Sequence, residues 1–129
     1  RFNGFDESFK RHQDWEFLTR IFTKYKLAST HNIGVVKINL DRNNATNPKK
    51  YEDNRIYFLN KMKGIIESLP NKNSMEIYDM HYGSIAKEYF RAHQFASMIK
   101  WCLKTSQPLS CFLNILRSAF VYFNKRIRA

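Results

Sequence analysis

Cysteine, proline and glycine are all scarce in this sequence of 129 residues, which holds two, three and four of them. Two cysteines, Cys102 and Cys111, cannot build a disulfide framework, so we expect a reduced, intracellular setting. The longest purely apolar run near the end covers residues 119–123. A membrane-spanning helix needs about 20 such residues, so none is predicted. Because the chain lacks a signal peptide and an initiator methionine and opens in a predicted loop, we expect a piece of a longer protein.

Acidic residues are also few, since 22 Lys and Arg stand against 11 Asp and Glu, which gives a net charge of +11. The imbalance is greatest in residues 84–129, where eight basic side chains face one acid, Glu88. Such an end attracts anions, namely lipid headgroups, nucleic acid or phosphorylated substrates. The alternative is a solvated basic face that keeps the protein in solution. Apolar residues at 43% exclude a disordered tail.

Hydrophobic spacing predicts a mainly α fold with a minor β element. A helix is expected from Gln13 to about Leu27, with Trp15, Leu18, Ile21, Phe22 and Tyr25 on one face. Residues 33–40 alternate as a strand. Asn47-Pro48 starts a second helix that Pro70 ends. Asn73 with Glu76 resembles a capping box for a third helix to about Ala92. Further helices are expected over residues 95–105 and from Pro108, the last with one apolar face made of Leu109, Phe112, Leu113, Leu116, Phe120 and Phe123.

The most specific motif is the segment NGFDESFKRHQDWEF at residues 3–17. It resembles the late motif of family-2, GT-A-fold glycosyltransferases, in which a Gly-Phe-Asp-Glu loop leads into an acidic pair, a Trp and an amphipathic helix that ends in Arg. Arg20 occupies that last place. The resemblance is specific over residues 3–20 and weakens beyond Arg42. It implies that residues 1–48 are the C-terminal part of a GT-A α/β domain and that 49–129 form a helical extension.

The resemblance implies roles for six residues. Asp14 would be the general base of an inverting sugar transfer, because a carboxylate must take the proton from the attacking acceptor hydroxyl. Trp15 would pack against the acceptor sugar, Gly4 would allow close backbone approach, Asp6 and Glu7 would shape the loop, and Arg42 would contact the donor phosphate. Four of them have a plainer alternative: a first-turn carboxylate for Asp14, core packing for Trp15, turn capping for Asp6 and a solvated turn residue for Arg42.

Partners and cofactors follow from the same resemblance. The complete enzyme would take a nucleotide-sugar donor and a glycan or lipid-linked acceptor in surface polysaccharide synthesis, on the cytoplasmic side of the membrane. A divalent metal, Mg²⁺ or Mn²⁺, is expected in the parent enzyme, on an Asp-x-Asp motif that this chain lacks. We therefore expect residues 1–129 alone neither to bind the donor well nor to turn over. No nucleic-acid motif is present, so no nucleic-acid partner is expected.

The last helix offers a second function. Its apolar face and basic end suit a membrane interface through residues 109–128, and its alternative is packing on the preceding helices. An exposed strand edge would also invite a homodimer. The competing hypothesis for the whole chain is a basic helical binding module without catalysis, which docks on a membrane surface, nucleic acid or a protein partner and in which Asp14 has no role.

Overall fold

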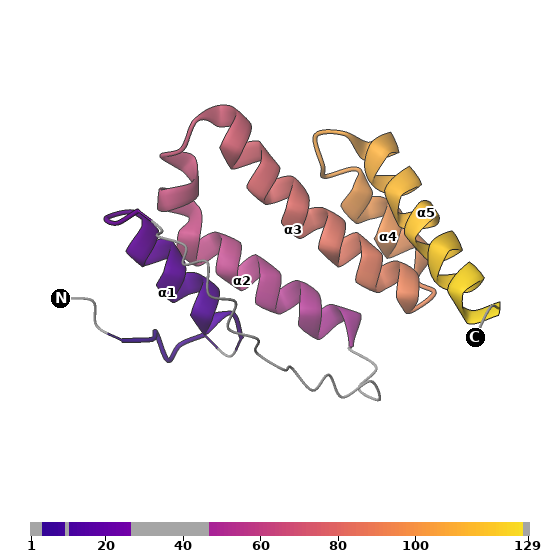
Figure 1. The fold of residues 1–129 in the computed structure, drawn as a ribbon, viewed down its shortest axis with the longest axis horizontal. Helices are drawn as coiled ribbons and strands as arrows, with labels where there is room; N and C mark the ends of the chain where they lie inside the picture. Colours follow the sequence, from indigo (N-terminus) through magenta and orange to yellow (C-terminus); the bar gives the residue numbers. More distant parts are fainter. Residues whose placement is uncertain (1–3, 10, 27–46, 128–129) are drawn as a thin grey trace, which may run out of the picture. The chain divides into compact units, whose positions relative to one another are not determined.

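The computed structural model describes residues 4–9, 11–26 and 47–127, with side chains as far as Phe120. All regular structure in these residues is α-helical (Figure 1). The chain divides into two compact units, residues 1–45 and 46–129. The mainly α prediction is confirmed. The predicted strand over residues 33–40 lies outside the described residues.

The first unit contains helix α1, which spans Gln13–Phe22. We expected this helix to continue to about Leu27, but it ends five residues earlier. Thr23 forms the C-cap, and its Oγ1 donates a hydrogen bond to the Arg20 carbonyl at 2.7 Å. The Lys24 amide bonds Ile21 three residues back, so the last turn tightens and the helix stops.

Helix α2 spans Pro48–Glu67 and begins where the sequence predicts. The side chain of Asn47 accepts hydrogen bonds from the Lys49 amide at 2.9 Å and the Lys50 amide at 3.3 Å. Pro48 occupies the first helical position, where its missing N–H costs nothing. The helix buries four apolar residues, Phe58, Leu59, Met62 and Ile66.

Helix α3 spans Asn71–Arg91 and corrects one prediction. Asn73 is not a cap, because the helix already begins at Asn71 with Pro70 in the N-cap position. Pro70 has an extended backbone, and its carbonyl accepts the Ser74 amide at 3.1 Å. The fixed φ of proline thus places the helix start directly after it, so Asn73 and Glu76 fall inside the helix.

Helices α4, Phe95–Cys102, and α5, Pro108–Ile127, complete the second unit. His93, with a φ of 59°, breaks the chain between α3 and α4, near the predicted position. We expected α4 to continue to Thr105, but the Thr105 hydroxyl instead donates to the Cys102 carbonyl at 2.7 Å. Pro108 begins α5 as predicted.

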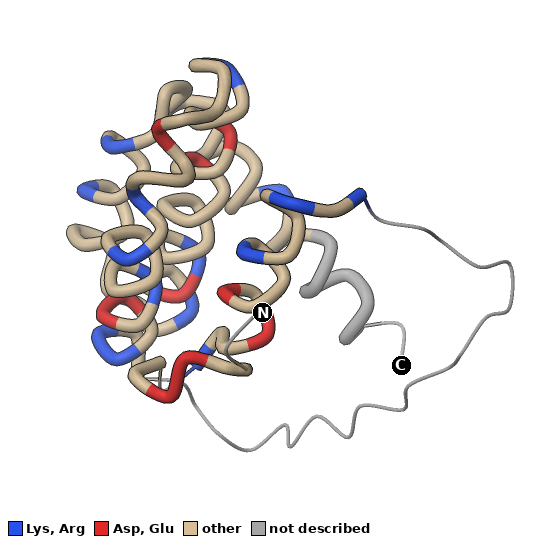
Figure 2. Tube along the Cα trace, turned by 90° about the vertical axis from the view of Figure 1, so that its left-hand side faces the viewer, with Lys and Arg blue, Asp and Glu red and all other residues tan. Residues whose placement is uncertain are grey.

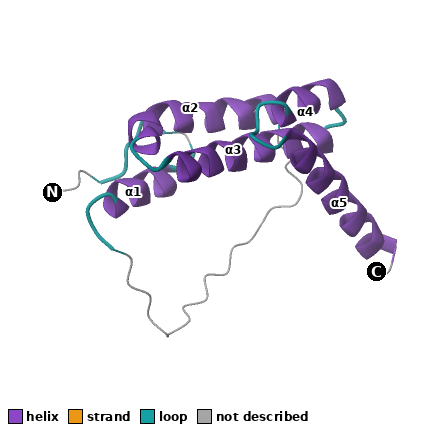
Figure 3. Cartoon of the chain, turned by 90° about the horizontal axis from the view of Figure 1, so that it is seen from above, coloured by secondary structure: helices purple, strands orange, loops and turns teal. Residues whose placement is uncertain are grey.

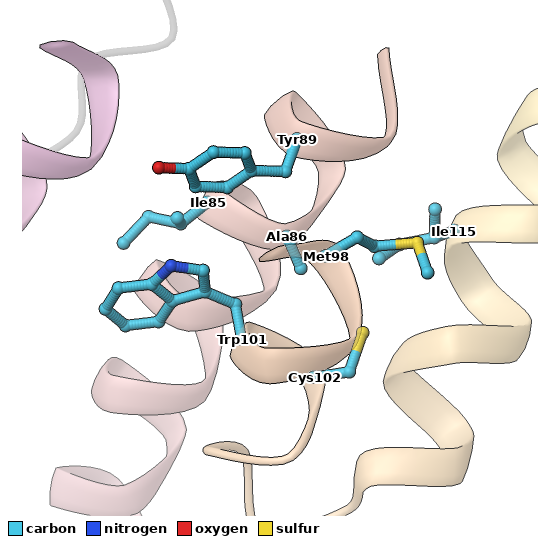
Figure 4. Close-up of a cluster of buried hydrophobic side chains, with 7 residues drawn as sticks. All are labelled: Ile85, Ala86, Tyr89, Met98, Trp101, Cys102 and Ile115. Carbon is cyan, nitrogen blue, oxygen red and sulfur yellow. The ribbon is translucent and has the colours of Figure 1, made fainter. Parts of the chain in front are cut away.

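The core of the second unit lies where α3 meets α4 and α5 (Figure 4). Its buried members are Ile85, Ala86, Tyr89, Met98, Trp101, Cys102 and Ile115. Ala86 is fully buried, and its small side chain lets α4 approach α3 closely. Seen from above, α2 and α3 run side by side, and every described element is a helix or a loop (Figure 3).

Helix α5 buries only the edge of the apolar face that the sequence predicts, together with Ile115 beside it. Ile115 is buried and Phe112 is partly buried against the core. Leu109, Leu113, Leu116 and Phe120 are 80%, 62%, 41% and 68% exposed. The alternative that this apolar face packs on the preceding helices is therefore wrong for these four residues. The side chain of Phe123 lies outside the described side chains.

Candidate functional site

The loop before α1 is tied to that helix by Arg20. The Arg20 guanidinium donates to the Gly4 carbonyl at 2.6 Å and to Glu16 Oε2 at 3.0 Å, and its Nε pairs with Glu16 Oε1. Glu16 is only 2% exposed, so this ion pair is largely desolvated on the carboxylate side. Arg20 therefore joins α1 to Gly4, which lies 16 positions earlier in the chain, and sets where the loop meets the helix.

Asp14 lies in the first turn of α1, and its side chain is exposed. The first turn of a helix has backbone N–H groups without intrahelical partners, and acidic residues are common there. A base that serves a bound acceptor must be reachable from solvent, and Asp14 meets that requirement. Its catalytic role stays a prediction, since a plain first-turn carboxylate would occupy the same position.

Trp15 follows Asp14, and its side chain is 36% exposed. Its ring lies 4.9 Å from the ring of His12, centroid to centroid. His12 is the N-cap residue of α1 and has a φ of 66°, a left-handed conformation that few residues other than glycine adopt. The start of α1 thus carries the aromatic pair of His12 and Trp15, with the exposed Asp14 between them in the sequence.

Gly4, Asp6 and Glu7 belong to the loop that Arg20 ties to α1 through the Gly4 carbonyl. Gly4 has a φ of 38°, which explains glycine at this position. Asp6 Oδ1 accepts the Ser8 amide at 2.9 Å, so Asp6 does cap a turn, as its plainer alternative proposed. Glu7 is exposed. Arg42 lies outside the described residues.

Sequence reasoning missed the buried parts of this corner. Glu16 is buried, Phe9 is 1% exposed, and the Gln13 side chain donates to the Phe9 carbonyl at 2.8 Å. The i, i+4 spacing of Glu16 and Arg20 was the available signal for an ion pair. Nothing in that spacing indicated that the Gly4 carbonyl would join it, because that contact depends on the path of the loop.

A second polar centre, also unpredicted, lies in the second unit at Glu52. Its Oε2 accepts hydrogen bonds from Tyr89 Oη at 2.6 Å and Trp101 Nε1 at 3.0 Å, and its Oε1 accepts from Lys49 Nζ at 2.7 Å. Burial acts to raise the pKa of Glu52, but the bonds from Lys49, Tyr89 and Trp101 outweigh burial, so its pKa is lowered. Burial and the bond to Glu52 raise the pKa of Tyr89 to about 12.

Glu52 is a structural centre by this geometry. Its carboxylate oxygens are occupied by donors from three helices, so they are not available to a substrate. Arg55 and His81 form a second buried polar pair whose partners also come from within the protein. Arg55 donates to Tyr51 Oη at 2.6 Å and lies 3.3 Å from His81 Nδ1, and the His81 ring stacks on Phe58 at 5.2 Å.

Among the residues that the structure describes, no three His, Cys, Asp or Glu side chains gather as a metal site. None of the described helices is long and apolar enough to cross a membrane. A groove of about 580 Å³ lies between α3 and α5, lined by Asp79, Lys87, Asn114 and several small side chains. Two of those, Ser84 and Ser118, bond the carbonyls of their own helices.

No family model, curated protein or solved structure matches this chain. The corner formed by loop 4–9 and α1 presents an exposed carboxylate and an aromatic ring at a helix start. Such an arrangement can hold a sugar ring and accept a proton from its hydroxyl.

Proposed function

We propose that this chain is the C-terminal part of an inverting glycosyltransferase of the GT-A fold. In this proposal residues 1–48 complete the catalytic domain on its acceptor side, and residues 49–129 form a helical extension. The donor is a nucleotide-sugar, and the acceptor is a glycan or a lipid-linked glycan. The setting is surface polysaccharide synthesis, on the cytoplasmic side of the membrane.

The observation that carries the proposal is the position of Asp14, exposed in the first turn of α1 beside Trp15. The motif of residues 3–20 assigns the base to this carboxylate, and the Arg20 clamp holds the motif's loop and helix together. A base must be accessible to the acceptor hydroxyl and held in place. The exposure of Asp14 gives access, and the clamp fixes the loop against the helix that carries Asp14.

The proposed reaction is a single displacement at the anomeric carbon of the donor sugar. The Asp14 carboxylate takes the proton of the acceptor hydroxyl while that oxygen bonds the anomeric carbon of the donor sugar. The bond from that carbon to the diphosphate breaks, and the nucleoside diphosphate leaves with the bonding electrons. Trp15 packs against the acceptor ring and orients its hydroxyl toward Asp14. A divalent metal would neutralise the donor diphosphate, and its ligands belong to the donor-binding half outside this chain.

The experiment that tests this function uses a chain in which residues 1–129 follow their donor-binding half. Nucleotide-sugars are screened with Mg²⁺ or Mn²⁺ for acceptor-dependent release of nucleoside diphosphate. We expect one donor class to support release. No release with any donor, under conditions in which the protein is folded, would favour the binding-module hypothesis instead. Residues 1–129 alone should show no millimolar donor binding by calorimetry.

The acceptor role of Trp15 has a matched control on the same helix. Phe22 is a second exposed aromatic residue of α1, one that lies in its last turn, at 47% exposure. Trp15→Ala should raise the KM for the acceptor by roughly tenfold, because apolar contact with the sugar is lost. It should leave the donor KM unchanged, and Phe22→Ala should change neither. Equal effects of the two variants would remove Trp15 from the acceptor site.

A further inference from the structure

Helix α5 carries an unusual surface. Leu109, Leu113, Leu116 and Phe120 recur at steps of four, three and four residues, so they form one continuous stripe along the helix. All four are more than 40% exposed, while the neighbouring side of the same helix packs Phe112 and Ile115 on the core. A contiguous apolar stripe on a surface marks a place where something docks.

The charge of this region indicates what docks there. Helix α5 contains no Asp or Glu over its 20 residues. Across residues 84–129 the one acid, Glu88, is paired with Arg91 at 2.5 Å, so it does not offset the other basic residues. Figure 2 marks basic and acidic positions along the described helices of both units. The stripe therefore lies in the most basic and least acidic part of the sequence.

A second copy of the same helix suits this surface poorly. Pairing two α5 helices along the stripe would bring Arg117 of each copy to the flank of the seam, with no acid on either helix to face it. Like charges at the flanks of a helical pair oppose association. An anionic surface has the complementary charge instead, and a bilayer also receives apolar side chains over the full length of a helix.

We propose that α5 binds the surface of an anionic lipid bilayer, lying parallel to it. Leu109, Leu113, Leu116 and Phe120 enter the boundary between headgroups and acyl chains, and basic residues attract the anionic headgroups. In the turn between α4 and α5, Leu103 is also exposed, and Lys104 Nζ lies 4.1 Å from the centroid of the Trp101 ring. The binding is peripheral, because apolar contact and charge together hold α5 on the bilayer surface and the helix does not cross the bilayer.

The test is flotation of residues 1–129 with vesicles of phosphatidylcholine, with and without phosphatidylglycerol. We expect binding only to the anionic vesicles, and weaker binding at high salt. The variant Leu109→Gln/Leu113→Gln should weaken binding by roughly tenfold or more, because two apolar side chains no longer leave water. Its matched control is Met75→Gln/Met80→Gln, which removes two exposed apolar residues of α3. The control should bind as the unaltered chain does.

A second variant keeps the test independent of lost folding. Phe120→Trp adds a third indole to the chain, in the stripe, and brominated lipid in anionic vesicles should quench the emission of this variant more than that of the unaltered chain, which has Trp15 and Trp101 only. Absence of vesicle binding, equal loss in both double variants, or no added quenching in Phe120→Trp would each overturn the proposal. Light scattering without lipid adds one more outcome. A dimer that the Leu109→Gln/Leu113→Gln variant converts to a monomer would assign the stripe to a second copy of the chain and reject the membrane.

Discussion

Trp101 Nε1 donates a hydrogen bond to Glu52 Oε2 at 3.0 Å, although 49 residues separate the two along the chain. Tyr89 Oη donates to the same oxygen at 2.6 Å. One carboxylate oxygen of α2 is thus shared by donors from α3 and α4. An acceptor shared by two partly buried donors is costly to remove, because both donors then lose their partner.

Glu52→Ala should lower the free energy of unfolding by about 2 kcal/mol, since the Tyr89 and Trp101 donors would be left unsatisfied. Glu67→Ala is the matched control. Glu67 lies at the end of the same helix and makes a longer, exposed pair with Lys63 at 3.8 Å. Its removal should change the unfolding free energy by less than about 0.5 kcal/mol. Urea unfolding followed by tryptophan fluorescence measures both, and equal losses would contradict the role of Glu52.

The stability of the folded chain should depend on pH through Glu52 and Tyr89. The pKa of Glu52 is lowered in the folded chain, so its contribution is present above the ordinary value of 4.5 and is lost as the pH falls below that value. The pKa of Tyr89 is raised to about 12 from 10, so its contribution is present below pH 10 and is lost as the pH rises toward 12. Glu52→Gln should flatten the acid limb of a plot of melting temperature against pH. An unchanged acid limb would show that Glu52 does not titrate with folding.

The two cysteines should differ in reactivity. Cys102 and Cys111 lie with their sulfur atoms 3.5 Å apart as free thiols. Burial, and then the hydrogen bond with Cys111, raises the pKa of Cys102 to about 12. Because the thiolate is the reactive form, iodoacetamide at neutral pH should modify the partly exposed Cys111 well before Cys102. Peptide mass spectrometry after brief labelling measures the order, and earlier labelling of Cys102 would contradict this environment.

The helix starts were predictable because they depend on local chemistry. Asn47 and Pro48 define the start of α2 from two adjacent residues, and Pro108 does the same for α5. The predicted start of α3 was wrong because two local signals competed. The backbone of Pro70 determined the start, and the resemblance of Asn73 and Glu76 to a capping box did not.

Burial was harder to predict because it depends on contacts between distant residues. Periodicity finds the wide apolar arc of α5, but it does not say that the half with Ile115 is covered while the half with Leu113 is exposed. The apolar face predicted for α1 also shows that periodicity does not determine burial. Trp15, Leu18 and Phe22 are all exposed, whereas Glu16 is buried through a contact with Arg20, which also reaches Gly4.

The central claim is that Asp14 is the general base, and one comparison tests it most directly. Asp14→Asn keeps the shape of the side chain and removes its basicity. Asp53→Asn is the matched control, since Asp53 is an exposed carboxylate near the start of α2 that pairs with Lys49 at 2.9 Å. In the chain joined to its donor-binding half, acceptor-dependent release of nucleoside diphosphate should fall by roughly a hundredfold or more in Asp14→Asn and stay unchanged in Asp53→Asn. Release that persists in Asp14→Asn at the rate of the unaltered chain would contradict the claim.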